Sequence, residues 1–312
     1  MSIPPTSATG SAGVAGAASA SINAETVRSR TLQGMAWMAA GGLTLCAMNA
    51  VMRVLTQEMS PLFAQFLRYL FAMLVMMPLL LRDGLGAYRP NNLRGQFWRG
   101  LFHALALTLF FLALPHIPLA DMTAIMFTTP IFVLIGAALL LGEKVTRARW
   151  GAALIGFVGV LIVMWPHLSG KGAGFWSLVM LGASPLFAGS FLINKALTRQ
   201  DSPGVIVMWQ NLTVTLYMLP LALPFWQELS WTQWGLFVLC GLLGTIAHYF
   251  MTRAFTMGDI SAMQPVRFLD LIWSSLFGLM LFGNVPTATA LLGGAVIVAS
   301  TMTSSSPPAS AP

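Results

Sequence analysis

Residues 61–81 read PLFAQFLRYLFAMLVMMPLLL, a run in which Arg68 is the only charged side chain. A helix of roughly 20 mostly apolar residues is long enough to cross the hydrocarbon core of a bilayer. The turn sequence Met59-Ser60-Pro61 stands at its start and makes the chain reverse there. This stretch therefore predicts a transmembrane helix with one charge inside the membrane.

The same character extends over the whole chain, which has 312 residues, 57% of them hydrophobic and 8% charged. A soluble domain carries roughly a quarter charged residues, so this composition excludes an ordinary soluble protein. Ten apolar segments are predicted to span the membrane: 31–53, 61–81, 95–114, 119–141, 147–165, 174–197, 204–225, 232–256, 260–282 and 287–303. Both cysteines lie inside these segments, which argues against a disulfide framework, a metal site or a cofactor.

The first run has a counterpart in the second half of the chain. A shift of 142 residues aligns Leu55-Thr56 with Leu197-Thr198, Ser60-Pro61 with Ser202-Pro203, and Met77-Pro78-Leu79 with Leu219-Pro220-Leu221. Chance similarity among apolar helices is the alternative, but it does not account for the matching turn prolines. Five spans per repeat is an odd number, so the second half enters the membrane from the opposite side. We therefore expect an all-α integral membrane protein with ten transmembrane helices in two inverted five-helix repeats, residues 31–165 and 174–303.

Basic residues predict the orientation of the chain in the membrane. With the N-terminus inside, the inner side collects Arg28, Arg30, Arg82, Arg89, Arg94, Arg99, Lys144, Arg147, Arg149, Lys195, Arg199 and Arg253, and the outer side collects Arg53 and Lys171. The positive-inside rule then places both termini in the cytoplasm of a bacterial cell, with the protein in the inner membrane. The net charge of +7 is topogenic and does not indicate a nucleic-acid partner. Residues 1–30 and 304–312 are expected to be disordered cytoplasmic tails.

Short motifs then point to a family. They are Arg68-Tyr69-Leu-Phe-Ala72, Thr129-Pro130, Leu140-Leu141-Gly142-Glu143, Pro265-Val266-Arg267-Phe268 and Leu281-Phe282-Gly283. With its ten spans and its repeat, the chain resembles the EamA family of the drug/metabolite transporter superfamily. The resemblance implies export of small metabolites, most of all amino acids including aromatic ones, as in the broad-specificity exporter branch. The alternative is an uptake permease for a nucleoside-like or adenosyl metabolite.

One position departs from the family pattern. Asn284 stands where the family often has the glutamate that Glu143 supplies in the first half. Any role of a second carboxylate is therefore in doubt in this chain.

Ionisable residues inside the spans are the first candidates for a binding site, because buried charge is costly and usually functional. Arg68 lies roughly 10 Å into its helix at 1.5 Å per residue, where it could hold a substrate carboxylate or bind carbonyls of a neighbouring helix to lock the fold. The structural role is the one we favour. Arg267 and Asp270 are three residues apart, so they share one helical face and could neutralise each other. They form either an anchor for a zwitterion or an internal salt bridge.

Polar and aromatic residues at span depth complete the predicted site. Gln264 and Trp273 extend the stripe of Arg267 and Asp270, and His103 could relay protons or donate to a neighbouring helix. The remaining candidates for substrate binding are Asn49, Gln210, Tyr217 and Tyr249. Pro130 removes a hydrogen bond within its predicted helix, which favours a kink that serves as a hinge.

The sequence offers no enzyme motif such as a zinc-binding His-Glu-x-x-His helix, so an enzyme is not expected. It also lacks the large loops of a membrane scaffold. We expect a monomeric transporter that works by alternating access around a midplane cavity between the repeats, with a small molecule and the lipid bilayer as partners. The scarcity of buried carboxylates favours facilitated transport over proton coupling.

Overall fold

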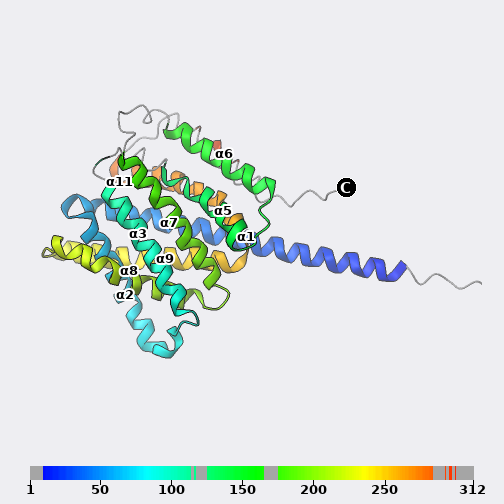
Figure 1. The fold of residues 1–312 in the computed structure, drawn as a ribbon, viewed down its shortest axis with the longest axis horizontal. Helices are drawn as coiled ribbons and strands as arrows, with labels where there is room; N and C mark the ends of the chain where they lie inside the picture. Colours follow the sequence, from blue (N-terminus) through cyan, green and yellow to red (C-terminus); the bar gives the residue numbers. More distant parts are fainter. Residues whose placement is uncertain are drawn as a thin grey trace, which may run out of the picture.

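The computed structural model describes residues 10–113, 116, 125–164, 175–283, 292, 295, 296 and 299, without the side chains of residues 10–24, 160, 163 and 164. The α-helices are α1 (Gly10–Glu58), α2 (Pro61–Asp83), α3 (Leu93–Ala113), α5 (Thr129–Leu140), α6 (Arg147–Met164), α7 (Phe175–Leu197), α8 (Pro203–Ala222), α9 (Trp231–Met257), α10 (Ile260–Met263) and α11 (Leu269–Phe282). Short 3₁₀ helices are η1 (Leu85–Tyr88), η3 (Leu223–Phe225) and η4 (Pro265–Phe268). The described ranges contain no strand, and their helices pack as one bundle (Figure 1).

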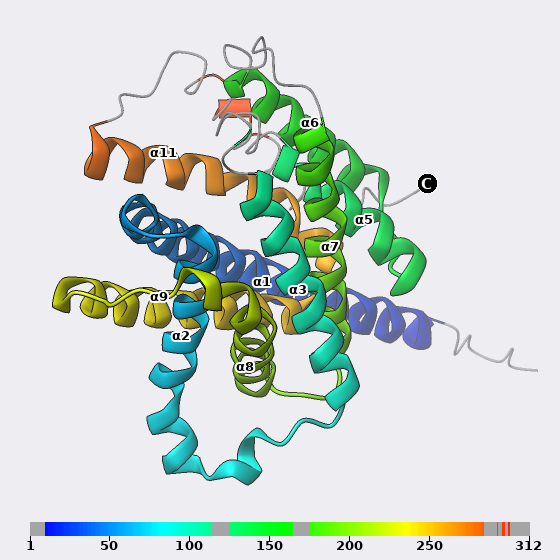
Figure 2. The same ribbon diagram turned by 60° about the vertical axis from the view of Figure 1, so that its left-hand side comes forward.

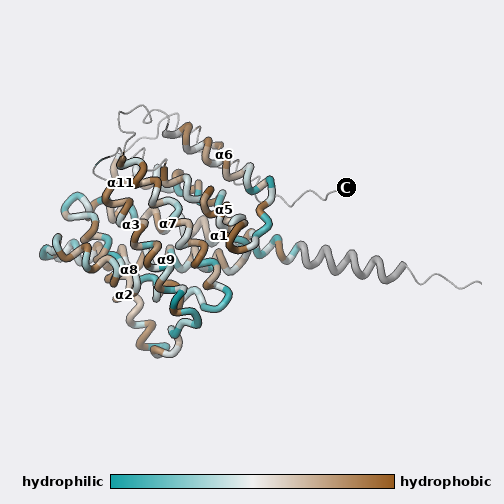
Figure 3. Tube along the Cα trace, viewed as in Figure 1, coloured by the Kyte–Doolittle hydropathy of each residue, from teal (hydrophilic) through white to brown (hydrophobic). Residues whose placement is uncertain are grey.

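Within those ranges, seven helices are long and apolar enough to cross a membrane: Glu25–Glu58 of α1, α2, α3, α7, Pro203–Phe225, α9 and Ile260–Phe282. Apolar residues follow these helices, and hydrophilic ones gather in loops and at helix ends (Figure 3). The prediction of an all-helical membrane protein is confirmed at this level. The segment predicted at 287–303 lies almost wholly outside the described residues, and the one at 119–141 is described only from residue 125.

Local sequence explains where the helices begin and end. Pro61 and Pro203 each occupy the first turn of a helix, where the missing N–H has no intrahelical partner to lose. The Ser202 side chain caps α8 by accepting from the Val205 amide, and Ser230 caps α9 by accepting from an amide in its first turn. At its other end, α11 stops at Gly283, which has a left-handed φ of 67°.

Two segments differ from the sequence-based expectation. Residues 10–30 continue α1 as a helix, although the sequence predicts a disordered tail for residues 1–30. Alanine, the strongest helix former, recurs in this stretch. The single helix expected over residues 260–282 is divided into α10, η4 and α11. Pro265 begins η4, and its missing N–H removes one hydrogen bond from the α-helical ladder at this break.

The helices pack in a recurring arrangement. Helix α1 lies between α9 and α11, and α7 lies between α3 and α5 (Figure 2). Helices α2 and α8 pack against each other, α2 also against α9 and α8 also against α3. Close approach of α2 and α9 depends on Gly241, since a Cβ there would lie 2.6 Å from the backbone carbon of Phe71. A small residue at this position lets the two helix backbones approach each other.

Candidate functional site

Polar side chains from five helices meet in the interior of the bundle. We call this group the central cluster; its members are Gln65, Arg68, Tyr69, Arg99, His103, Ser190, Gln210 and His248. All of them are buried, with exposures of 6% or less. They come from α2, α3, α7, α8 and α9, so the cluster joins helices of both halves of the chain.

Arg68 is held at one side of the cluster. Its guanidinium donates to Gln65 Oε1 (3.1 Å) on the preceding turn and to His248 Nε2 (3.3 Å) on α9. Gln210 Nε2 lies 3.4 Å from the same histidine nitrogen. The Arg68 guanidinium also stacks over the Tyr69 ring, 4.6 Å from its centroid. Among the described residues, the hydrogen bonds of Arg68 thus go to side chains of its own helix and of α9.

His103 occupies the other side. Its Nε2 lies 2.8 Å from the Tyr69 hydroxyl, and its Nδ1 lies 3.4 Å from Ser190 Oγ on α7. Its ring meets those of His248 and Phe187 edge to face, with centroids 5.6 and 5.2 Å apart. Both ring nitrogens have partners, and two aromatic faces meet at this point.

Arg99 belongs to the cluster although the sequence assigns it to the basic inner side. It is 2% exposed, donates to the Ile206 carbonyl (2.9 Å) and bonds Gln210 Oε1. Because Arg99 lies only six residues after the start of α3, the sequence groups it with the basic residues that set the orientation of the chain in the membrane. Gln65, Tyr69, Ser190 and His248 were likewise absent from the predicted site, and their positions on facing helices are what the sequence alone could not give.

The stripe predicted on residues 264–273 lies beside η4 and α11. Gln264 is fully buried and donates to the Ile260 carbonyl (3.0 Å). Arg267 stacks over the Phe191 ring of α7, 4.5 Å from its centroid. Asp270 points to α1, where a Cβ on Gly42 would collide with its carboxylate. Arg267 and Asp270 form no ion pair, so the prediction of an internal salt bridge between them is wrong. The Arg267 guanidinium lies against α7, and the Asp270 carboxylate lies against α1.

Aromatic rings connect the two groups. Phe191 stacks with Phe187 at 6.5 Å, and Phe187 meets the ring of His103 at 5.2 Å. A continuous line of rings on α7 therefore runs from the guanidinium of Arg267 to the central cluster. A planar ligand with polar edges would find both stacking surfaces and hydrogen-bond partners along this line.

Four other predicted residues lie elsewhere. Asn49 and Tyr249 are exposed, and Tyr217 lines a surface groove of about 310 Å³ with Arg94 and Trp98. Pro130 sits in the first turn of α5, where its missing N–H costs that helix no hydrogen bond. It follows the helical residues 125–126 and the turn at residues 127–128.

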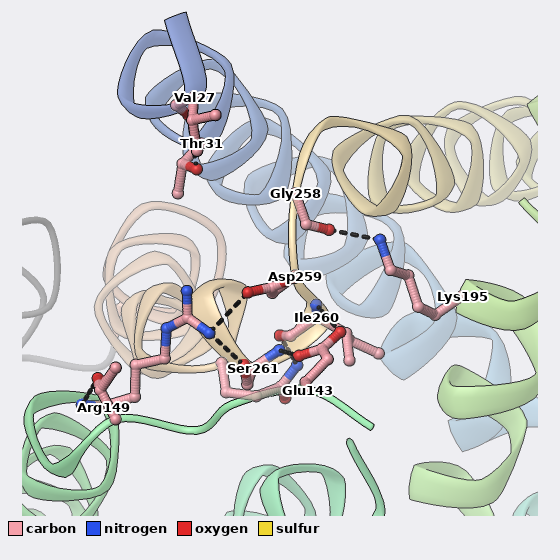
Figure 4. Close-up of polar contacts among 11 residues, drawn as sticks. Val27, Thr31, Glu143, Arg149, Lys195, Gly258, Asp259, Ile260 and Ser261 are labelled. Atoms are coloured by element: carbon pink, nitrogen blue, oxygen red, sulfur yellow. Dashed lines mark hydrogen bonds and ion pairs between the residues drawn. The ribbon is translucent and has the colours of Figure 1, made fainter. Parts of the chain in front are cut away.

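A second polar group closes the end of the bundle where α9 turns into α10 (Figure 4). Glu143 accepts from the amides of Ile260 (2.9 Å) and Ser261 (3.1 Å). Arg149 donates to Asp259 Oδ2 (2.9 Å) and Ser261 Oγ (2.8 Å). We call this group, residues 143, 149 and 259–261, the α10 latch. It ties residues of the first half to the turn before α10.

Lys195 of α7 secures the same turn from its other side. Its ammonium donates to the carbonyls of Phe255 (2.6 Å) and Gly258 (2.5 Å) at the end of α9. These are carbonyls that a helix leaves without intrahelical partners. The reversal between α9 and α10 is thus held by charged groups from the loop between α5 and α6, from α6 and from α7.

Neither the interior polar residues nor the α10 latch supplies the ligands of a metal centre in the described ranges. No three His, Cys, Asp or Glu side chains converge on one point in the part of the chain that is described. Cys46 and Cys240 are buried and free. What the described interior offers is stacking, hydrogen bonding and positive charge.

Comparisons with known proteins place these features in a family. The profile of the EamA-like transporter family matches residues 32–165 and 174–306. A riboflavin transporter of Rhizobium johnstonii is 33% identical over 88% of this chain and 91% of its own. The S-adenosylmethionine uptake transporter of Rickettsia prowazekii is 24% identical over 87% and 92%, and the pseudopaline exporter CntI of Pseudomonas aeruginosa is 26% identical over 82% and 89%.

A solved structure, titled "Crystal structure of protein", shares the fold at a TM-score of 0.73 and 18% identity, covering 88% of this chain and 96% of the other. The family predicted from the motifs is confirmed, and the relatives place the chain among bacterial multi-pass membrane transporters of small molecules. The chain belongs to the EamA-like transporter family.

Proposed function

We propose that this protein carries a planar heteroaromatic metabolite with a ribose-like or polyol side chain across the membrane, with riboflavin as the first candidate. The observation that carries the proposal is full-length similarity to two proteins named riboflavin transporter. These come from Rhizobium johnstonii (33% identity) and Vibrio cholerae (31% identity over 88% of this chain).

The interior chemistry supports this substrate class. The rings of Tyr69, His103 and Phe187 offer faces for stacking, and Gln210 with Arg68 offers donors and an acceptor beside them. A flavin joins a flat, largely apolar ring to a polar edge and a hydroxylated chain. It therefore needs both kinds of contact in one site, as heteroaromatic ligands generally do.

The amino-acid substrate expected from the resemblance has weaker support. The relatives described above are named for riboflavin, S-adenosylmethionine and pseudopaline, and none of them for an ordinary amino acid. The alternative expectation, a nucleoside-like or adenosyl metabolite, is chemically nearer to riboflavin because both join a heteroaromatic ring to a ribose-type chain. We adopt this second class in place of the first.

We further infer that the two halves are inverted repeats, which would make ten spans with the site between them. Two observations support this. The neighbours of α7 (α3 and α5) correspond to those of α1 (α9 and α11) under the shift of about 142 residues. The same shift places Arg68 on Gln210, and both contact His248. Gly142 and Gly283, which the repeat also aligns, share a φ of 67°.

Alternating access follows as the mechanism. The α10 latch would close the predicted cytoplasmic end while the site faces the other side. A carrier that works by facilitated transport needs no carboxylate to bind a coupled proton. Asp270 is the one carboxylate in the central cluster and the stripe of residues 264–273. We therefore propose gradient-driven movement, with the direction set by substrate concentration and not by a coupled proton.

Reconstituted proteoliposomes test the proposal. Labelled riboflavin, S-adenosylmethionine and phenylalanine are measured separately for entry and for release from preloaded vesicles, with and without an imposed pH gradient. We expect riboflavin to move in both directions down its gradient, and the pH gradient to leave its rate unchanged. Phenylalanine flux without riboflavin flux would overturn the substrate class, and flux that requires the pH gradient would overturn the facilitated mechanism.

A further inference from the structure

Two buried donors beside α11 have no hydrogen-bond partner among the described residues, and the carboxylate that stands between them in the sequence forms no ion pair there. Arg267 Nη1 and the Trp273 indole Nε1 are both buried without a hydrogen bond in the described structure. The Asp270 carboxylate forms no ion pair with Arg267 and meets the bare backbone of Gly42 on α1. A buried donor without a partner costs about 1–3 kcal/mol, so two of them beside an unpaired carboxylate call for a ligand.

The order of these groups defines what they could bind. Residues 267, 270 and 273 follow at intervals of three, which keeps them on one side of the η4–α11 segment. The segment thus presents a donor, an acceptor and a donor in sequence. The complementary edge has an acceptor, a donor and an acceptor, which is the pattern of a cyclic imide.

We propose that Arg267, Asp270 and Trp273 form a reading edge for the imide of the substrate. Arg267 and Trp273 donate to the two imide carbonyls, and Asp270 accepts the imide N–H between them. This inference rests on the proposed function and makes it more specific, since the pyrimidine end of a flavin carries such an imide, as does a uracil nucleoside. The adenine of an adenosyl metabolite does not.

Stacking supports the same orientation. The Arg267 guanidinium lies over Phe191, which leads through Phe187 to His103 in the central cluster. A ring system whose imide lies at residues 267–273 would extend along these rings, with its hydroxylated chain toward the amide of Gln210. A zwitterionic amino acid could pair with Arg267 and Asp270, but it would leave the Trp273 N–H unused.

Methylation of the imide nitrogen tests the proposal directly. Purified protein is titrated with riboflavin and with N3-methylriboflavin, and with uridine and 3-methyluridine as a second pair that lacks the flavin ring. We expect the wild type to bind each parent at least about tenfold more tightly than its methylated form, because a site built for an N–H rejects an analogue without it.

Variants then assign the preference to the reading edge. Asp270→Ala should lower riboflavin affinity about tenfold and leave N3-methylriboflavin within about threefold, so that the preference collapses. Trp273→Phe should weaken riboflavin binding about fivefold while keeping the ring. The matched controls are Asp83→Ala at the end of α2 and Trp231→Phe, which is 92% exposed; both should retain the preference.

The outcomes separate this inference from the proposed function. Riboflavin bound as tightly as its N3-methyl form, or a loss in Asp270→Ala that is equal for both, overturns the reading edge and leaves riboflavin transport standing. A wild type that ignores riboflavin but prefers uridine to 3-methyluridine keeps the reading edge and overturns riboflavin as the cargo. Tighter binding of phenylalanine than of any imide overturns both.

Discussion

At the scale of single residues, the interior shows how a charge can be kept inside a membrane protein. Arg99 is buried among α3, α7 and α8, where the carbonyl of Ile206 and the amide oxygen of Gln210 accept hydrogen bonds from its guanidinium. Its own carbonyl lies 3.4 Å from Ser190 Oγ. These contacts replace water for a group that is costly to bury.

Removal of this guanidinium should therefore destabilise the protein. We expect Arg99→Ala to lower the free energy of unfolding by about 3 kcal/mol, because Gln210 and the Ile206 carbonyl lose their buried partner. Arg94→Ala, one turn earlier and exposed, should change stability by less than about 0.5 kcal/mol. Thermal unfolding of the purified variants in detergent measures both. Equal midpoints for the two variants would contradict the role given to Arg99.

At the scale of helices, the bundle depends on places where two backbones come close. Gly241 on α9 faces the backbone of Phe71 and Ala72 on α2, with the Ala72 nitrogen 2.7 Å from where a Cβ would stand. Backbone atoms cannot rotate away as a side chain can. Gly235 on the same helix has nothing within 4 Å of that position.

These two glycines form a matched pair for mutation. Gly241→Ala should push α2 and α9 apart and cost about 1–3 kcal/mol, the usual effect of overpacking. Gly235→Ala should be neutral or stabilise by roughly 0.5 kcal/mol, since alanine is the better helix former. The test is the thermal midpoint of each variant together with its fraction of monodisperse protein in size-exclusion chromatography. A Gly241→Ala protein as stable as the wild type would show that α2 and α9 can separate freely.

At the scale of the whole molecule, the sequence was most informative about periodic features and least about contacts. Apart from the longer α1 and the divided segment 260–282, the hydrophobic runs predict the bounds of the described spans within a few residues, because a bilayer imposes both length and polarity on a helix. The position of Gln264 to Trp273 next to α1 and α7 did not follow, since the break at Pro265 decides where those side chains point. Tyr69 and Ser190 could not be selected for a related reason: their importance arises from facing helices, and residue spacing along one helix does not reveal it.

The α10 latch carries the prediction at this scale. Glu143→Ala removes the acceptor of the Ile260 and Ser261 amides, so the latched end should open more often. In a background with Cys46→Ala and Cys240→Ala, a cysteine placed by Thr252→Cys, which is fully buried, reports that opening. We expect a membrane-impermeant thiol reagent on the cytoplasmic side to label it several-fold faster in Glu143→Ala. Glu58→Ala, exposed at the other end of α1, is the control. Unchanged labelling would mean that the latch does not gate this end.

The arginines of the interior have one more consequence, for the sign of what can pass. The central cluster and the reading edge together hold three guanidinium groups, those of Arg68, Arg99 and Arg267, against the single carboxylate of Asp270. In an interior of low dielectric constant, this surplus of positive charge acts as an electrostatic filter. A neutral flavin crosses it without penalty, whereas a sulfonium such as S-adenosylmethionine meets a barrier, so we expect its flux in proteoliposomes to be lower than that of riboflavin. Selectivity would then begin with the field inside the bundle, before any hydrogen bond to the cargo is made.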